Sequence, residues 1–99
     1  MLLSNEPGLY RAGKHGIRIE NLIAVRESNN LDTHTTGETF YEFETLTLCP
    51  YDTNMMDFSR MSTEEIQWIN NYHAWVYAEI APLLSKEEAI WLQEKCKAL

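Results

Sequence analysis

The stretch Asn5–Asn21, NEPGLYRAGKHGIRIEN, decides the fold of the first half of this chain. A Pro-Gly pair follows the first apolar residues, and two further glycines precede a run of β-branched residues. Proline cannot donate to a strand ladder and glycine favours turns, so the stretch predicts a strand, a connection and a returning strand. Glu6 and Glu20 then lie on neighbouring backbones, which are under about 5 Å apart in a sheet.

Three strands are expected around this stretch: Leu2–Glu6, Ile17–Arg26 and Phe40–Leu48. The second has a period of two, which places Arg18 and Glu20 on one face and mostly apolar residues on the other. Taken alone, Glu20 could be a solvated residue paired with Arg18. The third is rich in aromatic and β-branched residues and stops before Pro50.

Two other parts of the strand region contain candidate polar groups. Glu42 and Glu44 alternate within the third strand, and by chemistry alone they are as good a carboxylate pair as Glu6 and Glu20. The segment Glu27–Thr39 is polar and predicts a loop. Its His34 has no second His or Cys at ligand spacing, so a solvated histidine is expected there.

The second half of the chain predicts two helices. Ser62-Thr63-Glu64-Glu65 is a capping box, and the helix that it starts should run to about Ala81. Pro82 ends or kinks this helix, and a second cap at Ser85 begins a helix that runs to about Lys97. The sequence therefore predicts an α+β fold in one domain over residues 1–99, mainly strands in 1–50 and two helices in 62–98.

Composition limits the possible classes of function. The net charge is −7 and no basic residues cluster, which argues against binding to nucleic acid. No apolar run approaches 20 residues, so no membrane span is expected and a cytoplasmic location is favoured. Cys49 and Cys96 lie far apart without metal-ligand spacing, and both are interpreted as free thiols.

An aromatic stripe on the first predicted helix has two interpretations. Trp68, Tyr72 and Trp75 fall at helical spacing. They could pack into the core against the sheet. They could instead form a subunit interface, where Trp and Tyr are enriched.

Several motifs resemble a known family. Asn-Glu-Pro-Gly followed by Gly-Ile-Arg-Ile-Glu-Asn resembles the last two metal-ligand segments of the pita-bread metallopeptidases, the group of aminopeptidase P, prolidase, methionine aminopeptidase and creatinase. FETLTLCPYD, residues 43–52, and EEIQWINNYHAWV, residues 64–76, are similar to the C-terminal end of the larger, eukaryote-like aminopeptidases P. The resemblance extends over almost the whole chain.

The resemblance implies a site with two divalent metal ions. Glu6 would bind one ion and take part in proton transfer, and Glu20 would bridge both. Arg18 would be an orienting or oxyanion-side cation, and His15 would contact substrate or cap the turn. Mn²⁺ is the preferred metal, with Zn²⁺ or Co²⁺ as alternatives. The family has no ligand at Glu42 or Glu44, so Glu44 is assigned a structural or outer-shell role.

The implied activity is that of an Xaa-Pro aminopeptidase acting on peptides with proline at the second position. The family uses five protein ligands, three of them upstream of the two glutamates. The chain is thus expected to be a C-terminal fragment that is inactive and holds no metal by itself. The alternatives are a prolidase-type dipeptidase or a non-catalytic dimerisation module. The family also implies a homodimer, here through Trp68, Tyr72 and Trp75.

Overall fold

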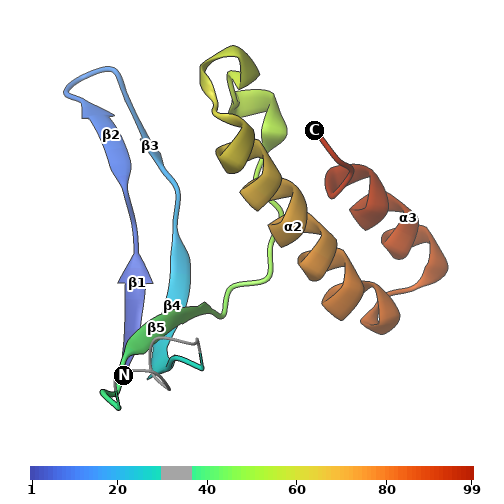
Figure 1. The fold of residues 1–99 in the computed structure, drawn as a ribbon. Helices are drawn as coiled ribbons and strands as arrows, with labels where there is room; N and C mark the ends of the chain where they lie inside the picture. Colours follow the sequence, from blue (N-terminus) through green and yellow to red (C-terminus); the bar gives the residue numbers. More distant parts are fainter. Residues whose placement is uncertain (30–36) are drawn as a thin grey trace. The chain divides into compact units, whose positions relative to one another are not determined.

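The computed structural model describes residues 1–29 and 37–99 (Figure 1). The elements are β1 (Leu2–Asn5), β2 (Gly8–Arg11), β3 (His15–Arg18), β4 (Asn21–Glu27), β5 (Tyr41–Thr45), the short 3₁₀ helices η1 (Thr53–Met55) and η2 (Phe58–Arg60), α2 (Thr63–Ile80), η3 (Ala81–Leu83) and α3 (Lys86–Lys95). The predicted class, antiparallel strands followed by two helices, is confirmed. His34 and the middle of the predicted loop lie outside the described residues.

The chain divides into two compact units, Met1–Thr47 and Leu48–Leu99. The N-terminal unit contains a three-stranded sheet of order β1-β4-β5 and a two-stranded sheet of β2 and β3. All pairs are antiparallel. Leu2 to Asn5 pair with Ala24 to Asn21, Gly8 to Arg11 pair with Arg18 to His15, and Ile23 to Glu27 pair with Thr45 to Tyr41.

Two strand predictions need correction. The expected connection after Pro7 is itself a hairpin, made of β2 and β3, and the expected strand Ile17–Arg26 is broken after Arg18. The physical reason is Pro7, which has no N–H to donate across the pair. One bond remains at the break, where the N–H of Ile19 donates to the carbonyl of Pro7 at 3.0 Å.

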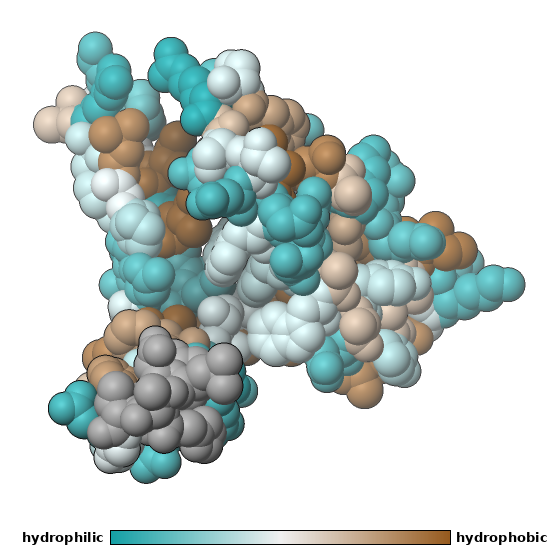
Figure 2. Space-filling model, viewed as in Figure 1, coloured by the Kyte–Doolittle hydropathy of each residue, from teal (hydrophilic) through white to brown (hydrophobic). Residues whose placement is uncertain are grey.

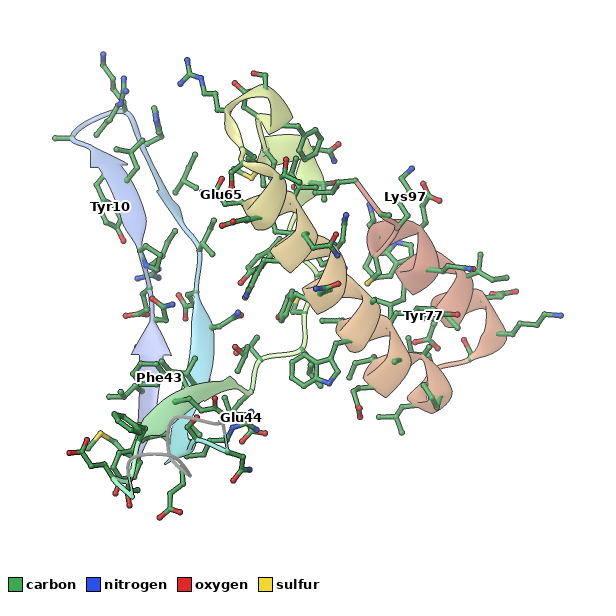
Figure 3. All side chains as sticks on the ribbon, viewed as in Figure 1. Tyr10, Phe43, Glu44, Glu65, Tyr77 and Lys97 are labelled. Atoms are coloured by element: carbon green, nitrogen blue, oxygen red, sulfur yellow. The ribbon has the colours of Figure 1, made fainter. Side chains whose placement is uncertain are left out.

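The glycines of the hairpin have two different roles. Gly13 has φ +71° at the tip, a conformation that favours glycine. Gly8 and Gly16 are needed for their small size, because the ring of Tyr10 lies against both. An added Cβ would lie 2.7 Å from the Tyr10 hydroxyl at Gly8 and 2.9 Å from its ring at Gly16. Tyr10, labelled in Figure 3, thus packs over the two glycines and fixes the hairpin.

In the C-terminal unit, α2 starts with the predicted capping box. The Oγ of Ser62 accepts from the N–H of Glu65 at 3.1 Å, and the Glu65 carboxylate accepts from the N–H of Ser62 at 3.0 Å. Pro82 lies in η3 and ends the long helix, as predicted. The Ser85 cap starts α3, which ends at Lys95, two residues earlier than expected.

The buried apolar residues among those described all belong to the C-terminal unit. Tyr72, Val76 and Leu92 form the centre of this core, and Ile69 is buried on the same helix. Both units also expose apolar side chains, which appear brown in Figure 2. Within residues 1–29 and 37–99, no helix has the length and hydropathy needed to span a bilayer.

Candidate metal centre

Glu6 and Glu20 occupy facing positions on adjacent backbones. On one side of them Asn5 pairs with Asn21, and on the other side Gly8 pairs with Arg18. The same register continues across the two positions between these pairs, as the bond from Ile19 to Pro7 demonstrates. Directly opposite residues of an antiparallel pair have Cβ atoms about 4.5–5.5 Å apart on a shared face. The register therefore sets Glu6 opposite Glu20, and a metal site shared by their carboxylates stays a prediction.

Glu20 has an ion-pair partner on its own side of the hairpin. The Nε of Arg18 lies 3.1 Å from a carboxylate oxygen of Glu20, and both side chains are about half exposed. The structure thus contains the ion pair with Arg18 that the alternative interpretation of Glu20 predicts. This ion pair does not exclude a metal, because a carboxylate has about four lone-pair sites and one Arg occupies only part of them.

Glu6 differs from Glu20 in its surroundings. Its side chain is exposed, and within the described residues it makes no hydrogen bond or ion pair. Over the same residues no group of three His, Cys, Asp or Glu side chains is placed to hold a metal ion. This chain therefore offers two carboxylates, fewer than the four or more donors that Zn²⁺ or Mn²⁺ takes.

His15 lies at the far end of the hairpin from the two carboxylates. It is exposed on β3 and pairs with Arg11 next to the tip. Five residues separate it from Glu20, about 16 Å along an extended strand. The structure does not bring His15 to Glu6 and Glu20, and its contact with substrate stays a prediction.

Glu42 and Glu44 have a common partner on the neighbouring strand. The Nε of Arg26 lies 2.8 Å from Glu42, and another guanidinium nitrogen lies 3.8 Å from Glu44. Arg26 directly opposes Glu42 in the β4–β5 register. Sheet pairing thus accounts for both carboxylates, in keeping with the structural role assigned to Glu44.

A second polar constellation lies in the C-terminal unit and was missed by sequence reasoning. The hydroxyl of Tyr72 donates to the carbonyl of Cys49 at 3.1 Å and accepts from the N–H of Cys49 at 3.4 Å. The N–H of Tyr51 donates to Nε2 of His73 at 3.1 Å. Two adjacent residues of α2 therefore hold the segment Leu48–Tyr51. The signal available in the sequence was the adjacent pair Tyr72 and His73, which lies along an apolar stripe of the first predicted helix.

Tyr72 therefore cannot serve as the predicted interface residue. Its ring is buried within its own unit, where it stacks on Trp68 at 5.4 Å and on Tyr51 at 5.2 Å. Trp68 and Trp75 remain 51% and 38% exposed. The aromatic stripe is thus divided, because a helix turns only part of its surface toward the core.

His73 is fully buried, with 0% of its surface exposed. Burial lowers the pKa of its imidazole from the ordinary value of 6.5, because a buried site disfavours the charged form. Its Nδ1 is buried and has no hydrogen-bond partner among the described residues. Since Nε2 accepts a hydrogen bond, the proton of the neutral ring is on Nδ1.

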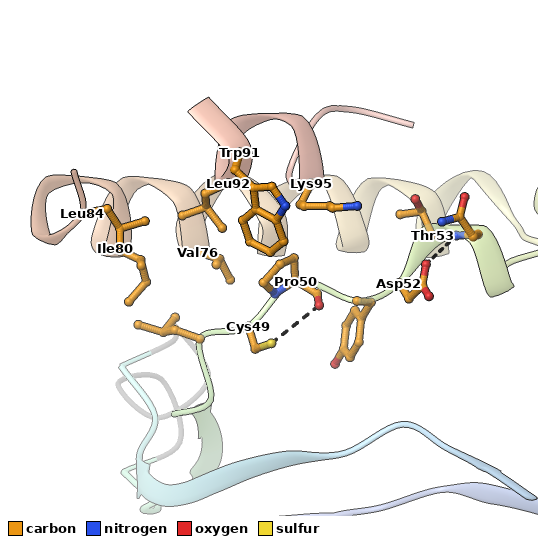
Figure 4. A pocket seen from close by; sticks show the side chains of 13 residues that line it. Cys49, Pro50, Asp52, Thr53, Val76, Ile80, Leu84, Trp91, Leu92 and Lys95 are labelled. Atoms are coloured by element: carbon orange, nitrogen blue, oxygen red, sulfur yellow. Dashed lines mark hydrogen bonds between the residues drawn. The ribbon is translucent and has the colours of Figure 1, made fainter. Parts of the chain in front are cut away.

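An apolar pocket of about 510 Å³ lies beside this constellation (Figure 4). Its walls include Pro50, Val76, Ile80, Trp91 and Leu92. Two of its polar groups are engaged locally: Asp52 accepts from the N–H of Asn54 at 3.0 Å, and the Cys49 thiol contacts the carbonyl of Pro50 at 3.7 Å. The remaining polar side chains of its lining are those of Tyr51, Thr53, Asn54 and Lys95.

Comparison with known proteins supports the motifs quoted above. A family model for the C-terminal region of peptidase M24 matches residues 39–99. Aminopeptidase P2 of Arabidopsis thaliana is 45% identical over 84 residues, which cover 85% of this chain and 12% of that protein. A probable Xaa-Pro aminopeptidase P of Laccaria bicolor is 38% identical over 102 residues, which cover 100% of this chain and 16% of that protein.

A solved structure has the same fold. The X-prolyl aminopeptidase of Caenorhabditis elegans, described as a cytosolic enzyme with a di-nuclear active site, matches with a TM-score of 0.85 and 38% identity. The match covers 99% of this chain and 16% of that one. This chain thus spans 12–16% of the length of these three relatives.

Proposed function

Because this chain belongs to the peptidase M24 family, whose C-terminal region it matches over residues 39–99, we propose that it contributes two metal ligands to an Xaa-Pro aminopeptidase. Such an enzyme hydrolyses the peptide bond before a proline in the second position. The observation that carries the proposal is the register that sets Glu6 opposite Glu20. The relatives named Xaa-Pro aminopeptidase P supply the substrate class.

The carboxylates of Glu6 and Glu20 fit as part of a two-metal site, since both are exposed, adjacent and hard oxygen donors. Glu20 would bridge the ions, and Glu6 would bind one and accept or return a proton beside the reacting peptide. When bound, such ions polarise a carbonyl and supply hydroxide at neutral pH. Arg18 holds one oxygen of Glu20 and thereby orients its carboxylate.

The preferred metal is Mn²⁺, because the two known donors are carboxylates and hard oxygen ligands suit that ion. Zn²⁺ and Co²⁺ are the alternatives. The 99-residue chain alone should bind Mn²⁺ only weakly, since two donors do not form a cage. Titration calorimetry measures this: stoichiometric binding at micromolar affinity or tighter would contradict a site that needs ligands from outside this chain.

The decisive test measures bound metal and kcat in the full-length protein that contains this chain. The protein is loaded with Mn²⁺ and assayed on an Xaa-Pro-Xaa tripeptide. Glu6→Gln and Glu20→Gln should each lose bound metal and at least about 100-fold in kcat, because the ions provide most of the oxyanion stabilisation. Glu42→Gln is the matched control, since it removes a paired strand carboxylate away from the site. A Glu20→Gln protein that keeps two metals and full activity would refute the proposal.

The same assay separates the alternatives. A prolidase-type enzyme would cleave Xaa-Pro dipeptides in preference to the tripeptide. A non-catalytic module would cleave neither and would leave metal content unaffected by Glu20→Gln. The relatives from Arabidopsis thaliana and Laccaria bicolor, both named as aminopeptidases, favour the aminopeptidase.

A homodimer in the cytosol completes the proposal. Trp68 and Trp75 are the two aromatic residues of the predicted interface that remain exposed, and Trp is enriched at interfaces. The description of the Caenorhabditis elegans relative as cytosolic supports the compartment. Sedimentation velocity on Trp68→Ala and Trp75→Ala tests the dimer, with Trp91→Ala, an exposed residue of α3, as the control.

A further inference from the structure

The segment Leu48–Tyr51 is hydrogen-bonded to α2 at two residues, Cys49 and Tyr51, and the two attachments differ in chemistry. The ring of Tyr51 also stacks on Trp68 and Tyr72. At Cys49 the partner is the hydroxyl of Tyr72, which both donates and accepts. At Tyr51 the partner is Nε2 of His73, which can accept only while the imidazole is neutral. The hydrogen bond at Tyr51 therefore depends on the protonation state of His73, and the bonds at Cys49 do not.

Protonation would reverse the Tyr51 contact. The Nε2 of an imidazolium carries a hydrogen, so it would face the N–H of Tyr51 donor to donor. The protonated ring would also have to remain charged in a site with 0% exposure and with no described partner at Nδ1. Both effects favour a rearrangement in which the ring reaches water and the segment leaves the helix.

On α2, no charged side chain lies one turn from His73 to compensate the imidazolium. The residues three and four positions away on α2, namely Ile69, Asn70, Val76 and Tyr77, are uncharged. The rings against His73 are those of Tyr51 and Tyr72, at 6.2 and 6.0 Å. From α3, the Cys96 thiol packs on the same core, and burial raises its pKa, so it too is neutral.

The charged groups of the neighbouring elements are engaged elsewhere. Asp52 accepts from the N–H of Asn54, Lys97 is paired with Glu94 at 2.8 Å, and Lys95 lies 5.7 Å from the centre of the Trp91 ring. The C-terminal Leu99 reaches α2 through its N–H, which donates to the side chain of Asn70 at 2.9 Å. Its carboxylate therefore belongs to a segment that is attached to α2 three residues from His73, and the test below includes it.

From these contacts we propose that His73 is an acid-sensitive latch: the neutral imidazole holds Tyr51 on α2, and its protonation releases the segment Leu48–Tyr51 at that point. Tyr72 keeps its hold on Cys49, so the release is local and not a loss of the fold. The segment follows directly on Thr47, whose hydroxyl accepts from the N–H of Leu22 at 2.8 Å. The proposed release concerns the first residues of the C-terminal unit. It is independent of the metal site proposed above.

The test is an NMR titration of the ¹⁵N-labelled chain from about pH 7.5 to 4.5, a range that spans histidine and stays above most carboxylates. The Tyr51 amide resonance should move with the same midpoint as the His73 ring, below 6.5, and its hydrogen exchange should accelerate while that of Cys49 changes less. His73→Gln keeps an acceptor but cannot titrate, so the Tyr51 shift should disappear. His15→Gln, an exposed histidine in the other unit, should leave the shift unchanged.

Each outcome bears on the proposal. A Tyr51 amide that does not respond over this range, or that still responds in His73→Gln, refutes it. A chain amidated at Leu99 should keep the response, and loss of the response there would assign the effect to the terminal carboxylate and refute the latch. If His73→Gln does not fold, the wild-type titration alone decides, because Tyr51 and His73 must share one midpoint.

Discussion

The Nε of Arg18 lies 3.1 Å from a carboxylate oxygen of Glu20, and the two side chains are 53% and 51% exposed. Arg18 is the last residue of β3, and Glu20 lies just before β4. The ion pair therefore bridges the break between the two strands on the return side of the hairpin. It gives Glu20 a local role in addition to the role in metal binding that we propose.

Replacing Glu20 should have little effect on the stability of this chain. Exposed ion pairs contribute roughly 0–1 kcal/mol, so Glu20→Gln should change the free energy of unfolding by less than about 1 kcal/mol at pH 7. Urea unfolding at low salt and in 1 M salt measures it, and salt should reduce any difference. Glu42→Gln, in the comparably exposed pair with Arg26, is the control. A decrease in the free energy of unfolding of more than about 2 kcal/mol would show that the main role of Glu20 is to stabilise the fold.

The hydroxyl of Tyr72 should matter more than that surface pair. Tyr72→Phe removes both part-buried bonds to Cys49 and leaves the N–H and carbonyl of Cys49 without that partner. Unsatisfied groups of this kind cost about 1–3 kcal/mol, which a urea titration should detect as a lower midpoint at unchanged slope. Tyr77→Phe is the control, since the Tyr77 hydroxyl makes no hydrogen bond within the described residues. Equal effects of the two changes would contradict the assignment.

The capping box at the start of α2 makes a separate contribution. Ser62→Ala removes the acceptor for the N–H of Glu65 and should lower the free energy of unfolding by about 1 kcal/mol. Thr63→Ala, one residue later and inside the helix, should have a much smaller effect. Thermal unfolding of both variants gives the comparison, and a Thr63→Ala loss as large as that of Ser62→Ala would argue against the cap.

His73 should make stability depend on pH in one direction. Its pKa is lowered in the folded chain, so the unfolded chain binds more protons once the pH falls below 6.5. The free energy of unfolding should therefore be highest above about pH 6.5 and should decrease as the pH falls from there toward the lowered value. Denaturation at pH 7.5 and at pH 5 measures the decrease, and His73→Gln should diminish it. A wild-type chain that gains stability on acidification, matched by His73→Gln, would contradict this.

The sequence predicted the elements better than it predicted their pairing. Both helix caps and the stop at Pro82 follow from local chemistry and were found, and each predicted strand range contains a strand. The third strand is shorter than predicted, since β5 ends at Thr45 and not near Pro50, and the β2–β3 hairpin was not predicted. The break between β3 and β4 was missed because nothing within Ile17–Arg26 requires it. Its cause is Pro7 on the opposite strand, and a cross-strand effect is invisible in the periodicity of one strand.

For the candidate site, residue types were predicted and surroundings were not. Glu6 and Glu20 were identified from their motifs, but only the register sets them opposite each other. His73 was missed because the first helix has two apolar stripes, and sequence alone does not say which one faces the core. The burial of Tyr72, which divides the predicted interface, was missed for the same reason.

The register of the long hairpin determines where this chain can tolerate insertions. Glu6 and Glu20 lie between two sets of four residue pairs, those of β1 with β4 and those of β2 with β3. The ring of Tyr10 packs against Gly8 and Gly16 in the β2–β3 pair. Residues added at the Gly13 turn are absorbed in the loop, as surface turns generally allow. A single residue added within either strand would turn one carboxylate to the opposite face. Relatives that keep the carboxylate pair can therefore differ freely in the length of the turn and hardly at all in the length of the strands.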